Sequence, residues 1–419
     1  MPERSPRPDP APETAGAAAD RPAAVAAAPS EHGPVIETRT DFLRAVERIA
    51  AGEGPTAIDA ERASGFRYSQ RAYLIQVFRR GAGSFLFDPP AIRSDGGDLH
   101  ELDEAIGDGE WIIHAASQDL TCLREVGIDP RTLFDTELAA RLLGMERVGL
   151  GAVVEELLGI HLEKAHSAVD WSIRPLHEDW LEYAALDVEL LVDVRDALRE
   201  RLVRDGKDGY AAEEFAATLE RDFNPPKTDP WRRMSDLHTV RGQRNLAVAR
   251  ELWLARDAYA QEIDTAPGRL VPDKSLSAAA RVLPASKREL AEMKEFNGRA
   301  SRTQLDRWWA AIERGRTTED LPQVRVPGDA LPPLRAWAER NPDAHARLVP
   351  ARESVAELAE QLSIPVENLL TPETLRRIAW APPSPATPEA IGDALQALGA
   401  RPWQIALTAQ RISESFSPA

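Results

Sequence analysis

The chain has 419 residues, of which 43% are hydrophobic and 28% are charged, and its formal net charge is −17 at pH 7. This length exceeds one ordinary hydrophobic core, so we expect two or three domains. The single cysteine, Cys122, excludes an internal disulfide and a cysteine-based zinc site. We expect a cytoplasmic protein without a membrane segment, because no apolar run reaches the roughly 18 residues of a spanning helix and no signal-peptide core is seen.

The charge is unevenly distributed along the chain. An acidic total is not typical of a nucleic-acid-binding protein, because contacts with phosphate favour basic surfaces. Residues 231–316, however, contain 17 Lys and Arg against 11 Asp and Glu. The sequence therefore predicts a basic segment within an acidic chain, and acidic residues elsewhere could hold metal ions.

The first half of the chain predicts an α/β domain behind an unstructured tail. Residues 1–33 are rich in Ala and Pro and lack periodicity, so we expect disorder there. Apolar strands then alternate with helical patterns, which predicts a mixed sheet flanked by helices over residues 34–215. Strands are expected at 34–38, 55–60, 72–78, 84–87 and 111–114, and helices at 117–126, 135–143, 150–158 and 178–204.

The second half of the chain is predicted to be helical. Residues 216–230 form a linker, because the prolines of FNPPKTDP cannot continue a helix. Residues 231–316 predict a first helical bundle, with helices at 237–263, from Ser286 onward and at 302–314. Residues 317–415 predict a second helical bundle, and the spacing of leucines in the two bundles hints at a diverged repeat.

Asp59 and Glu61 are the first residues that could carry chemistry, and they close the apolar stretch TAIDAE. Residues two apart on a strand point to the same face. Two carboxylates on one face of a buried strand repel each other, and a divalent metal ion would neutralise them. The alternative is a pair of solvated charges at the end of a strand, which is the more common origin of this pattern on its own.

Asp119, Tyr183 and Asp187 are the other candidates. Asp119 follows the apolar stretch WIIH at the start of a helix, where the alternative is a carboxylate favoured by the helix dipole. Tyr183 and Asp187 lie four residues apart on the predicted long helix and share a face, although this pair could also be solvated. Asp135 is interpreted as a helix cap, and His114 as a structural residue.

These residues together have the order of a two-metal hydrolysis site, in which several carboxylates hold two ions about 3.5–4 Å apart. One ion would activate water, the other would stabilise the leaving 3′ oxygen, and the tyrosine hydroxyl could orient the water. At these positions the chain resembles the tyrosine branch of the DEDD exonuclease superfamily. The matching residues are Asp59 and Glu61 in the first motif, Asp119 in the second, and Tyr183 and Asp187 in the third.

The resemblance narrows to the ribonuclease D family over about residues 34–215. It is carried by SGFRYSQRAYLIQV (64–77), FDTELAARLLG (134–144), LGAVVEELLG (150–159) and the stretch 164–191. The histidine branch would place a histidine where this chain has Glu182. The resemblance implies an RNase H-like fold and two Mg²⁺ or Mn²⁺ ions held by the four carboxylates. It also implies a 3′→5′ exoribonuclease that trims RNA 3′ ends, above all those of tRNA precursors, and releases 5′-nucleoside monophosphates.

Residues that flank the motifs could hold the substrate by stacking on bases or by contacting phosphates. For Trp171, packing of its loop is an equally weighted alternative. The candidates are Phe66, Tyr68 and Gln70 after the first acidic pair, and Lys164, Trp171 and Arg174 before the last helix.

The basic segment 231–316 resembles the HRDC domain, a small helical bundle that binds nucleic acid. The resemblance is carried by RGQRNLAVARELW and PGRLVPDKSLSAAA. Residues 317–415 resemble a second, degenerate HRDC domain. Candidate phosphate contacts are Arg241, Arg244, Lys274, Lys287 and Arg288, and the alternative for each is an ordinary solvated helix charge.

Two other functions remain open from the sequence. A 3′→5′ exonuclease acting on DNA would use the same chemistry, because the 2′-hydroxyl is what distinguishes RNA. A non-catalytic RNA-binding module would be expected to lack at least one metal ligand, and none is missing. Nothing in the sequence identifies a protein partner.

Overall fold

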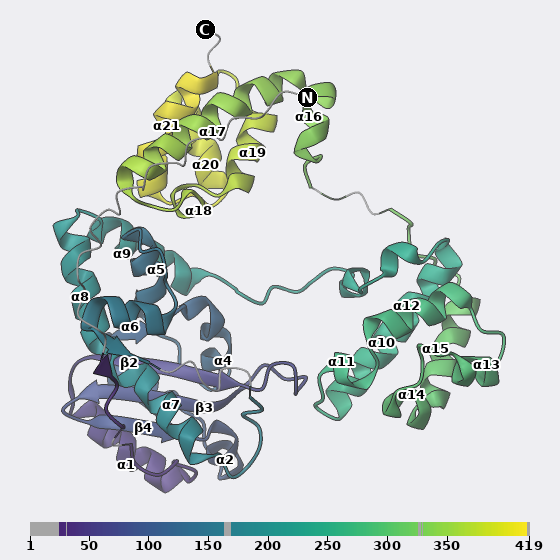
Figure 1. The fold of residues 1–419 in the computed structure, drawn as a ribbon, viewed down its shortest axis with the longest axis horizontal. Helices are drawn as coiled ribbons and strands as arrows, with labels where there is room; N and C mark the ends of the chain where they lie inside the picture. The colour runs from purple at the N-terminus through teal and green to yellow at the C-terminus, as the bar shows by residue number, and fades with distance from the viewer. Residues whose placement is uncertain (1–24, 31, 163–168, 326–327, 329, 417–419) are drawn as a thin grey trace, which may run out of the picture.

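The computed structural model describes residues 25–30, 32–162, 169–325, 328 and 330–416. These residues form three lobes joined by extended segments (Figure 1). We call them the sheet lobe (residues 32–220), the first helical lobe (230–317) and the second helical lobe (334–416). In the part of the chain that is described, no helix is both long and apolar enough to cross a membrane.

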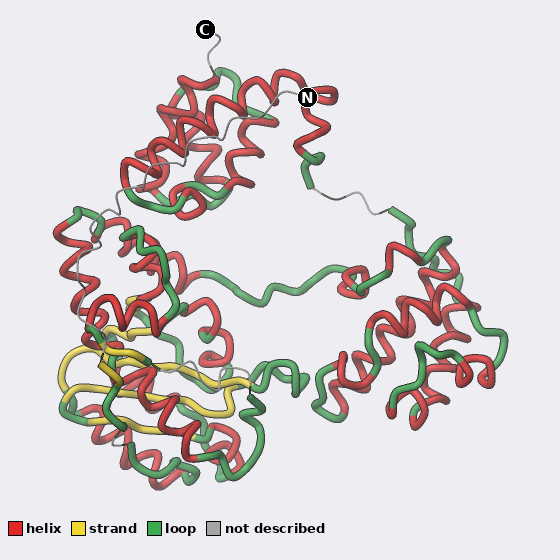
Figure 2. The backbone as a smooth tube through the Cα atoms, in the orientation of Figure 1, coloured by secondary structure: helices red, strands yellow, loops and turns green. Residues whose placement is uncertain are grey.

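A five-stranded mixed sheet organises the sheet lobe, with the strand order β4-β3-β2-β5-β6. β2 pairs antiparallel with β3, and β3 with β4, whereas β5 and β6 extend the sheet from β2 in parallel. Figure 2 shows these strands gathered in one lobe, with helices around them. The arrangement confirms the predicted fold class. The strands are β2 (Glu53–Arg62), β3 (Ala72–Arg80), β4 (Gly83–Phe87), β5 (Glu110–Ile113) and β6 (Thr132–Asp135).

The sheet buries side chains on both faces, and this alternation places the candidate residues beneath one helix. On β2, Ile58 joins the large core cluster, whereas Ala57 packs on the opposite face against Val188 of α7 (Glu178–Glu189). Asp59 and Glu61 follow Ala57 at steps of two, so they leave the strand on the face that α7 covers.

The sheet lobe has further helices besides α7. They are α1 (Arg39–Ala50), α2 (Pro89–Ser94), α3 (His100–Ile106), η1 (Ala116–Gln118), α4 (Leu120–Arg124), α5 (Thr136–Leu142), α6 (Leu150–Leu158), α8 (Leu191–Arg204) and α9 (Asp208–Glu220).

Several elements of the sheet lobe differ from the sequence prediction, and α9 continues to Glu220, into the stretch 216–230 that was predicted as a linker. The stretch 34–38 does not form a strand, because it pairs with the sheet at a single position, the bridge between Ile36 and Phe87. The strand β6 was not predicted, since four residues are too few to show a period of two. The helix predicted over 178–204 is two helices, α7 and α8, which meet at Leu190. The apolar periodicity continues through this junction and therefore gave no sign of it.

Part of the N-terminal segment is ordered, in contrast to the predicted disorder. The short strand β1 (Val25–Ala26) pairs in parallel with β7 (Ile160–His161). Ser30 Oγ also donates a hydrogen bond of 2.6 Å to Glu189. Backbone pairing with an open strand edge needs no apolar periodicity, which is why composition did not reveal it. The tail prediction for residues 1–24 lies outside the described residues.

The first helical lobe is a bundle built on α10 (Gln243–Glu262) and α15 (Leu305–Thr317), and Trp308 is fully buried in its core. The helix predicted to begin at Ser286 is confirmed, because the Ser286 side chain accepts a hydrogen bond from the N–H of Glu289. The other elements are η2 (Pro230–Arg233), η3 (Leu237–Thr239), α11 (Pro267–Leu270), α12 (Asp273–Val282), α13 (Lys287–Glu292) and α14 (Arg299–Thr303).

The second helical lobe is also entirely helical in its described residues, and it packs on the sheet lobe through α9. Tyr210 of α9 stacks on Trp403, with ring centroids 4.7 Å apart, and Glu214 pairs with Arg401. The apolar cores of the two lobes form one continuous cluster. The elements are η4 (Leu334–Ala336), α16 (Trp337–Arg340), α17 (Pro342–Leu362), α18 (Val366–Leu369), α19 (Pro372–Trp380), α20 (Pro388–Ala397) and α21 (Pro402–Phe416).

Candidate active site

Three carboxylates meet beneath α7. Asp59 and Glu61 come from the end of β2, and Asp187 comes from α7. One oxygen from each lies within 4.8 Å of the others. Asp187 is buried, so its charge is shielded from water and needs compensation from nearby groups. The fold therefore brings together residues that are far apart in sequence, as the motif order predicted.

Asp119 reaches the same place from the turn after β5. Ala115 in this turn has a positive φ of 60°, and the short helix η1 follows it. Asp135 holds the turn, because its carboxylate accepts hydrogen bonds from the N–H groups of Ala115 and Ala116 at 3.1 and 2.9 Å. Asp119 is 6% exposed and is hydrogen-bonded to the carboxyl group of Asp59.

Arg62 is the nearest cation to these carboxylates that the structure records. Its Nη2 atom lies 3.8 Å from Asp119. The ladder between β2 and β3 shifts register between Glu61 and Arg62, and such a bulge can turn a side chain toward a site beside the strand. Sequence reasoning missed this residue, because a bulge leaves no mark on apolar periodicity.

The four carboxyl groups all have raised pKa values. Burial is the main cause at each, and at Glu61 the nearby Asp59, Asp187 and Asp119 raise the pKa further. Arg62 opposes the rise at Asp59, Glu61 and Asp119. Concentrated, partly protonated carboxylates are what a site for divalent cations contains before it binds them. Oxygen ligands at this density fit Mg²⁺ or Mn²⁺.

Tyr183 lies one helical turn before Asp187 and is hydrogen-bonded to it. Burial, followed by the charges of Asp187 and Glu61, raises the pKa of the Tyr183 hydroxyl well above its usual range. The hydroxyl therefore keeps its proton at neutral pH and can act as a hydrogen-bond donor.

A cavity of about 1040 Å³ opens on these residues. It is also lined by the start of α6, by His161 of β7 and by Leu162. This volume is at the upper end of the range for small-molecule sites. His114 also lines the cavity, and burial lowers its pKa to about 4, which favours the neutral form. Its Nδ1 atom lies 2.9 Å from the Thr136 hydroxyl oxygen.

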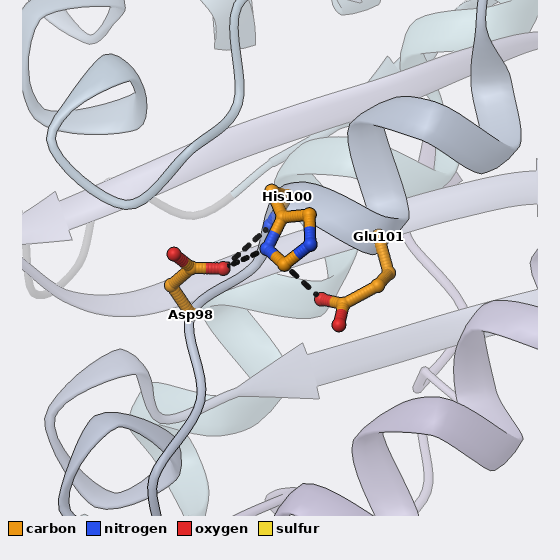
Figure 3. A group of neighbouring side chains, drawn as sticks. All are labelled: Asp98, His100 and Glu101. Carbon is orange, nitrogen blue, oxygen red and sulfur yellow. Dashed lines mark hydrogen bonds and ion pairs between the residues drawn. The ribbon is translucent and has the colours of Figure 1, made fainter.

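Asp98, His100 and Glu101 form a second group with metal-ligand chemistry in the described residues (Figure 3). These residues are neighbours in sequence at the start of α3. Their oxygens already have partners, because Asp98 and Glu101 contact His100 and Glu101 also pairs with Arg39. We therefore interpret this group as a local ion-pair cluster.

The residues predicted after the first acidic pair lie where the sheet lobe meets the first helical lobe. The guanidinium of Arg269 lies 4.0 Å from the centre of the Phe66 ring, and the Tyr68 hydroxyl donates to Asp257 at 3.1 Å. Gln70 is exposed, and its amide nitrogen lies 3.3 Å from the carbonyl oxygen of Tyr68. Phe66 and Tyr68 thus contact the neighbouring lobe as well as flanking the catalytic strand.

The residues predicted before the last helix occupy different positions. Lys164 lies outside the described residues. Trp171 is fully buried and packs edge-on against Trp180, in agreement with the loop-packing alternative. Arg174 donates to the buried Asp88 and to the carbonyl of Tyr73 at 2.5 and 2.7 Å, so its guanidinium ties its loop to β3.

The five cations predicted to contact phosphate also divide into two groups. Arg244 donates to the carbonyl groups of Gly315 and Thr318, while Lys287 pairs with Asp306 and Arg288 with Glu292. Arg241 and Lys274 form the second group: both are exposed, and neither has an ion pair within the described residues.

Three protein families match successive parts of the chain. The family described as 3′-5′ exonuclease matches residues 34–203, and the HRDC domain matches residues 245–312. Residues 330–416 match a family described as the C-terminal domain of 3′ to 5′ exonucleases.

Several curated relatives are ribonuclease D proteins. That of Granulibacter bethesdensis is 32% identical over 297 residues, which cover 67% of this chain and 71% of the relative. That of Acidiphilium cryptum is 30% identical over 356 residues, which cover 80% of this chain and 88% of the relative.

Two solved structures are similar over most of their length. A protein from Bifidobacterium adolescentis shares 36% identity, with a TM-score of 0.87 over 94% of this chain and 99% of that one. RNase D from Escherichia coli, described as an exoribonuclease involved in structured RNA processing, shares 26% identity. Its TM-score is 0.65 over 87% of this chain and 98% of that one.

Proposed function

Because the chain belongs to the ribonuclease D family and is a 3′→5′ exoribonuclease, we propose that it trims RNA one nucleotide at a time, with tRNA precursors among its substrates. Each cycle hydrolyses the terminal phosphodiester and releases a 5′-nucleoside monophosphate. One observation carries the proposal: the carboxylates of Asp59, Glu61, Asp119 and Asp187 converge with Tyr183 on one cavity. The single cysteine, Cys122, is buried, which suits a reducing cytoplasm as the place of action.

The four carboxylates are assigned as ligands of two divalent cations, Mg²⁺ or Mn²⁺. When bound, such a pair of ions supplies an activated water and stabilises charge on the leaving 3′ oxygen. Asp59 is within 4.8 Å of Glu61 and Asp187 and is also hydrogen-bonded to Asp119. Asp59 would thus be the central member of the four carboxylates that would hold the ions.

Tyr183 is assigned the role of orienting the attacking water. Its hydroxyl keeps its proton and lies beside Asp187. The one hydroxyl proton is directed at Asp187 in this structure. Once Asp187 holds a cation, that proton would be available for a hydrogen bond to the water, which would fix the direction of the water's lone pair toward the phosphorus. Arg62, next to Asp119, offsets part of the negative charge when the phosphate approaches.

RNA contacts are proposed for the predicted residues that remain open to solvent. These are Gln70, which accepts a hydrogen bond from the cavity-lining Ser64, and Arg241 and Lys274 on the first helical lobe. Arginine and lysine at such positions would bind phosphates without regard to sequence. The other predicted residues that are described already contact the protein itself. Phe66, Tyr68, Arg174 and Arg244 contact the neighbouring lobe or the backbone, Trp171 is packed in its loop, and Lys287 and Arg288 form ion pairs within their own lobe.

The substrate class is tested with a tRNA precursor carrying a 3′ extension and a DNA of the same sequence, both labelled at the 5′ end. Each is incubated with Mg²⁺, Mn²⁺ or EDTA. We expect stepwise shortening of the RNA with either ion and none with EDTA. Preferential shortening of the DNA would favour the repair alternative, and binding without shortening would favour the non-catalytic one.

A further inference from the structure

Gln76 is a buried polar residue that the chemistry described above does not use. It lies in the middle of β3 between Ile75 and Val77 and is 0% exposed. Neither its Oε1 nor its Nε2 atom has a hydrogen-bond partner among the described residues. A buried amide without partners destabilises a protein, so an apolar residue would be expected at this position.

The register of the sheet places Gln76 directly opposite Asp59. The two residues are partners in the antiparallel ladder between β2 and β3. Directly opposed residues point to the same face, with Cβ atoms roughly 4.5–5.5 Å apart. A glutamine side chain can span that distance. Gln76 therefore leaves the sheet on the face that carries the proposed metal ligands.

Few polar groups share this face with Gln76, and Ser84 of β4, which lies diagonal to it, already donates a hydrogen bond to Glu189 of α7. Its other ladder partner is Leu86 of β4. The helix α7 covers this face with Ala184, Ala185 and Val188, whose side chains offer no polar atom. Along the ladder with β2, Asp59 is directly opposite Gln76, whereas Glu61 lies one diagonal step away, opposite Leu74. Asp59 is therefore the nearest carboxylate of β2 that could accept a hydrogen bond from the Gln76 amide.

We propose that Gln76 is a positioning residue, whose Nε2 donates a hydrogen bond to the Asp59 carboxylate when that carboxylate binds a divalent cation. Carboxylates that bind metals are commonly held by such outer hydrogen bonds, which fix the oxygen that faces the ion. The partnerless amide is then retained because it orients the ligand, at some expense to the stability of the metal-free protein. This inference rests on the proposed metal site.

The substitutions Gln76→Met and Gln76→Leu test the proposal, because both keep the side chain buried and remove the amide. The dissociation constant for Mn²⁺ is measured by calorimetric titration of the full-length protein, and the melting temperature is measured without metal. We expect Mn²⁺ to bind roughly 10–100-fold more weakly. The metal-free melting temperature should stay equal or rise, since a partnerless buried amide has been removed.

A matched control is Thr56→Val. Thr56 on β2 is also fully buried with a hydroxyl that has no partner among the described residues, but it lies on the same face as Ile58, opposite to the face that carries Asp59 and Gln76. This variant should bind Mn²⁺ like the wild type. Wild-type Mn²⁺ affinity in both Gln76 variants would overturn the proposal, as would a loss of affinity accompanied by a lower metal-free melting temperature.

The Asp59→Asn variant separates the failure of this inference from the failure of the metal site. Weak Mn²⁺ binding in Asp59→Asn together with wild-type binding in the Gln76 variants would overturn the role of Gln76 alone. Wild-type Mn²⁺ binding in Asp59→Asn would overturn the metal site itself and the role of Gln76 with it.

Discussion

The carboxylate of Asp264 accepts a hydrogen bond of 2.9 Å from the backbone N–H of Ser69, in the loop that follows the catalytic strand. Asp264 also pairs with Arg71 at 3.1 Å and accepts from the Tyr73 hydroxyl at 3.2 Å. Asp264 therefore holds the loop that connects β2 to β3, together with Asp257 and Arg269 of the same lobe. We infer that docking of this lobe and the geometry of the proposed metal ligands are linked through that loop.

The substitution Asp264→Ala should loosen the loop and raise the KM for RNA several-fold. Asp264→Asn should have a smaller effect, because the amide oxygen can still accept from Ser69 and asparagine tolerates the positive φ of 43°. Hydrogen exchange of residues 64–71, measured beside the kinetics, should increase in the same order. Asp306→Ala is the control, since Asp306 is exposed in the same lobe and pairs only locally with Lys287. Equal exchange in all four proteins would argue against the coupling.

The substitution Tyr183→Phe should lower kcat by about 10²-fold through loss of the hydroxyl that orients the water. The Mn²⁺ affinity should change little, because the four carboxylates remain. Single-turnover rates and Mn²⁺ titrations on the same preparation check both expectations. A parallel loss of Mn²⁺ affinity would instead make Tyr183 a support for Asp187.

Metal affinity should increase with pH. The pKa values of Glu61, Asp119 and Asp187 are raised, by burial first and then by neighbouring carboxylates. In the unfolded chain these groups have their usual pKa values, 4.5 for Glu and 3.8 for Asp. Between these values and the raised values of the folded protein, the folded metal-free protein therefore binds more protons than the unfolded chain. The stability that these protons give to the folded metal-free protein is complete below that pH range, and it is lost as the pH rises through the raised pKa values.

Divalent cations replace those protons, so the increase in melting temperature caused by Mg²⁺ should become larger with rising pH. Thermal unfolding with and without Mg²⁺ between about pH 5 and 8 measures this difference. The same difference at every pH would show that the carboxylates do not exchange protons for metal.

The substitution Glu214→Ala should weaken the packing of the second helical lobe. Glu214 is 5% exposed, pairs with Arg401 and accepts from the Trp403 indole at 2.9 Å. Its removal leaves these donors without a partner, and we expect a loss of about 1–3 kcal/mol in the free energy of unfolding. The free energy of unfolding is measured with denaturant for Glu214→Ala and for a control, Glu353→Ala, which changes an exposed residue of α17. A change equal to that of the control would exclude Glu214 as a tie between lobes.

The sequence indicated the main chemistry because that chemistry depends on local spacing. Asp59 and Glu61 share a face through strand alternation, and Tyr183 and Asp187 share one through helical spacing. The long-range relationships were not accessible in the same way. The opposition of Gln76 and Asp59 depends on strand register, which no local pattern in β3 encodes. Phe66 and Tyr68 look like substrate contacts in sequence, and only the docking of the neighbouring lobe shows their other partners.

The most direct test of the central claim compares wild type, Asp59→Asn and Asp98→Asn on a 5′-labelled RNA with Mg²⁺. Asp98 belongs to the surface ion-pair cluster, so its substitution matches the change in charge away from the cavity. We expect a ladder of products shortened from the 3′ end by wild type and Asp98→Asn. Asp59→Asn should be slower by about 100-fold or more, since metal ligation contributes several kcal/mol. Wild-type shortening by Asp59→Asn would contradict the assignment of these carboxylates as the catalytic metal site.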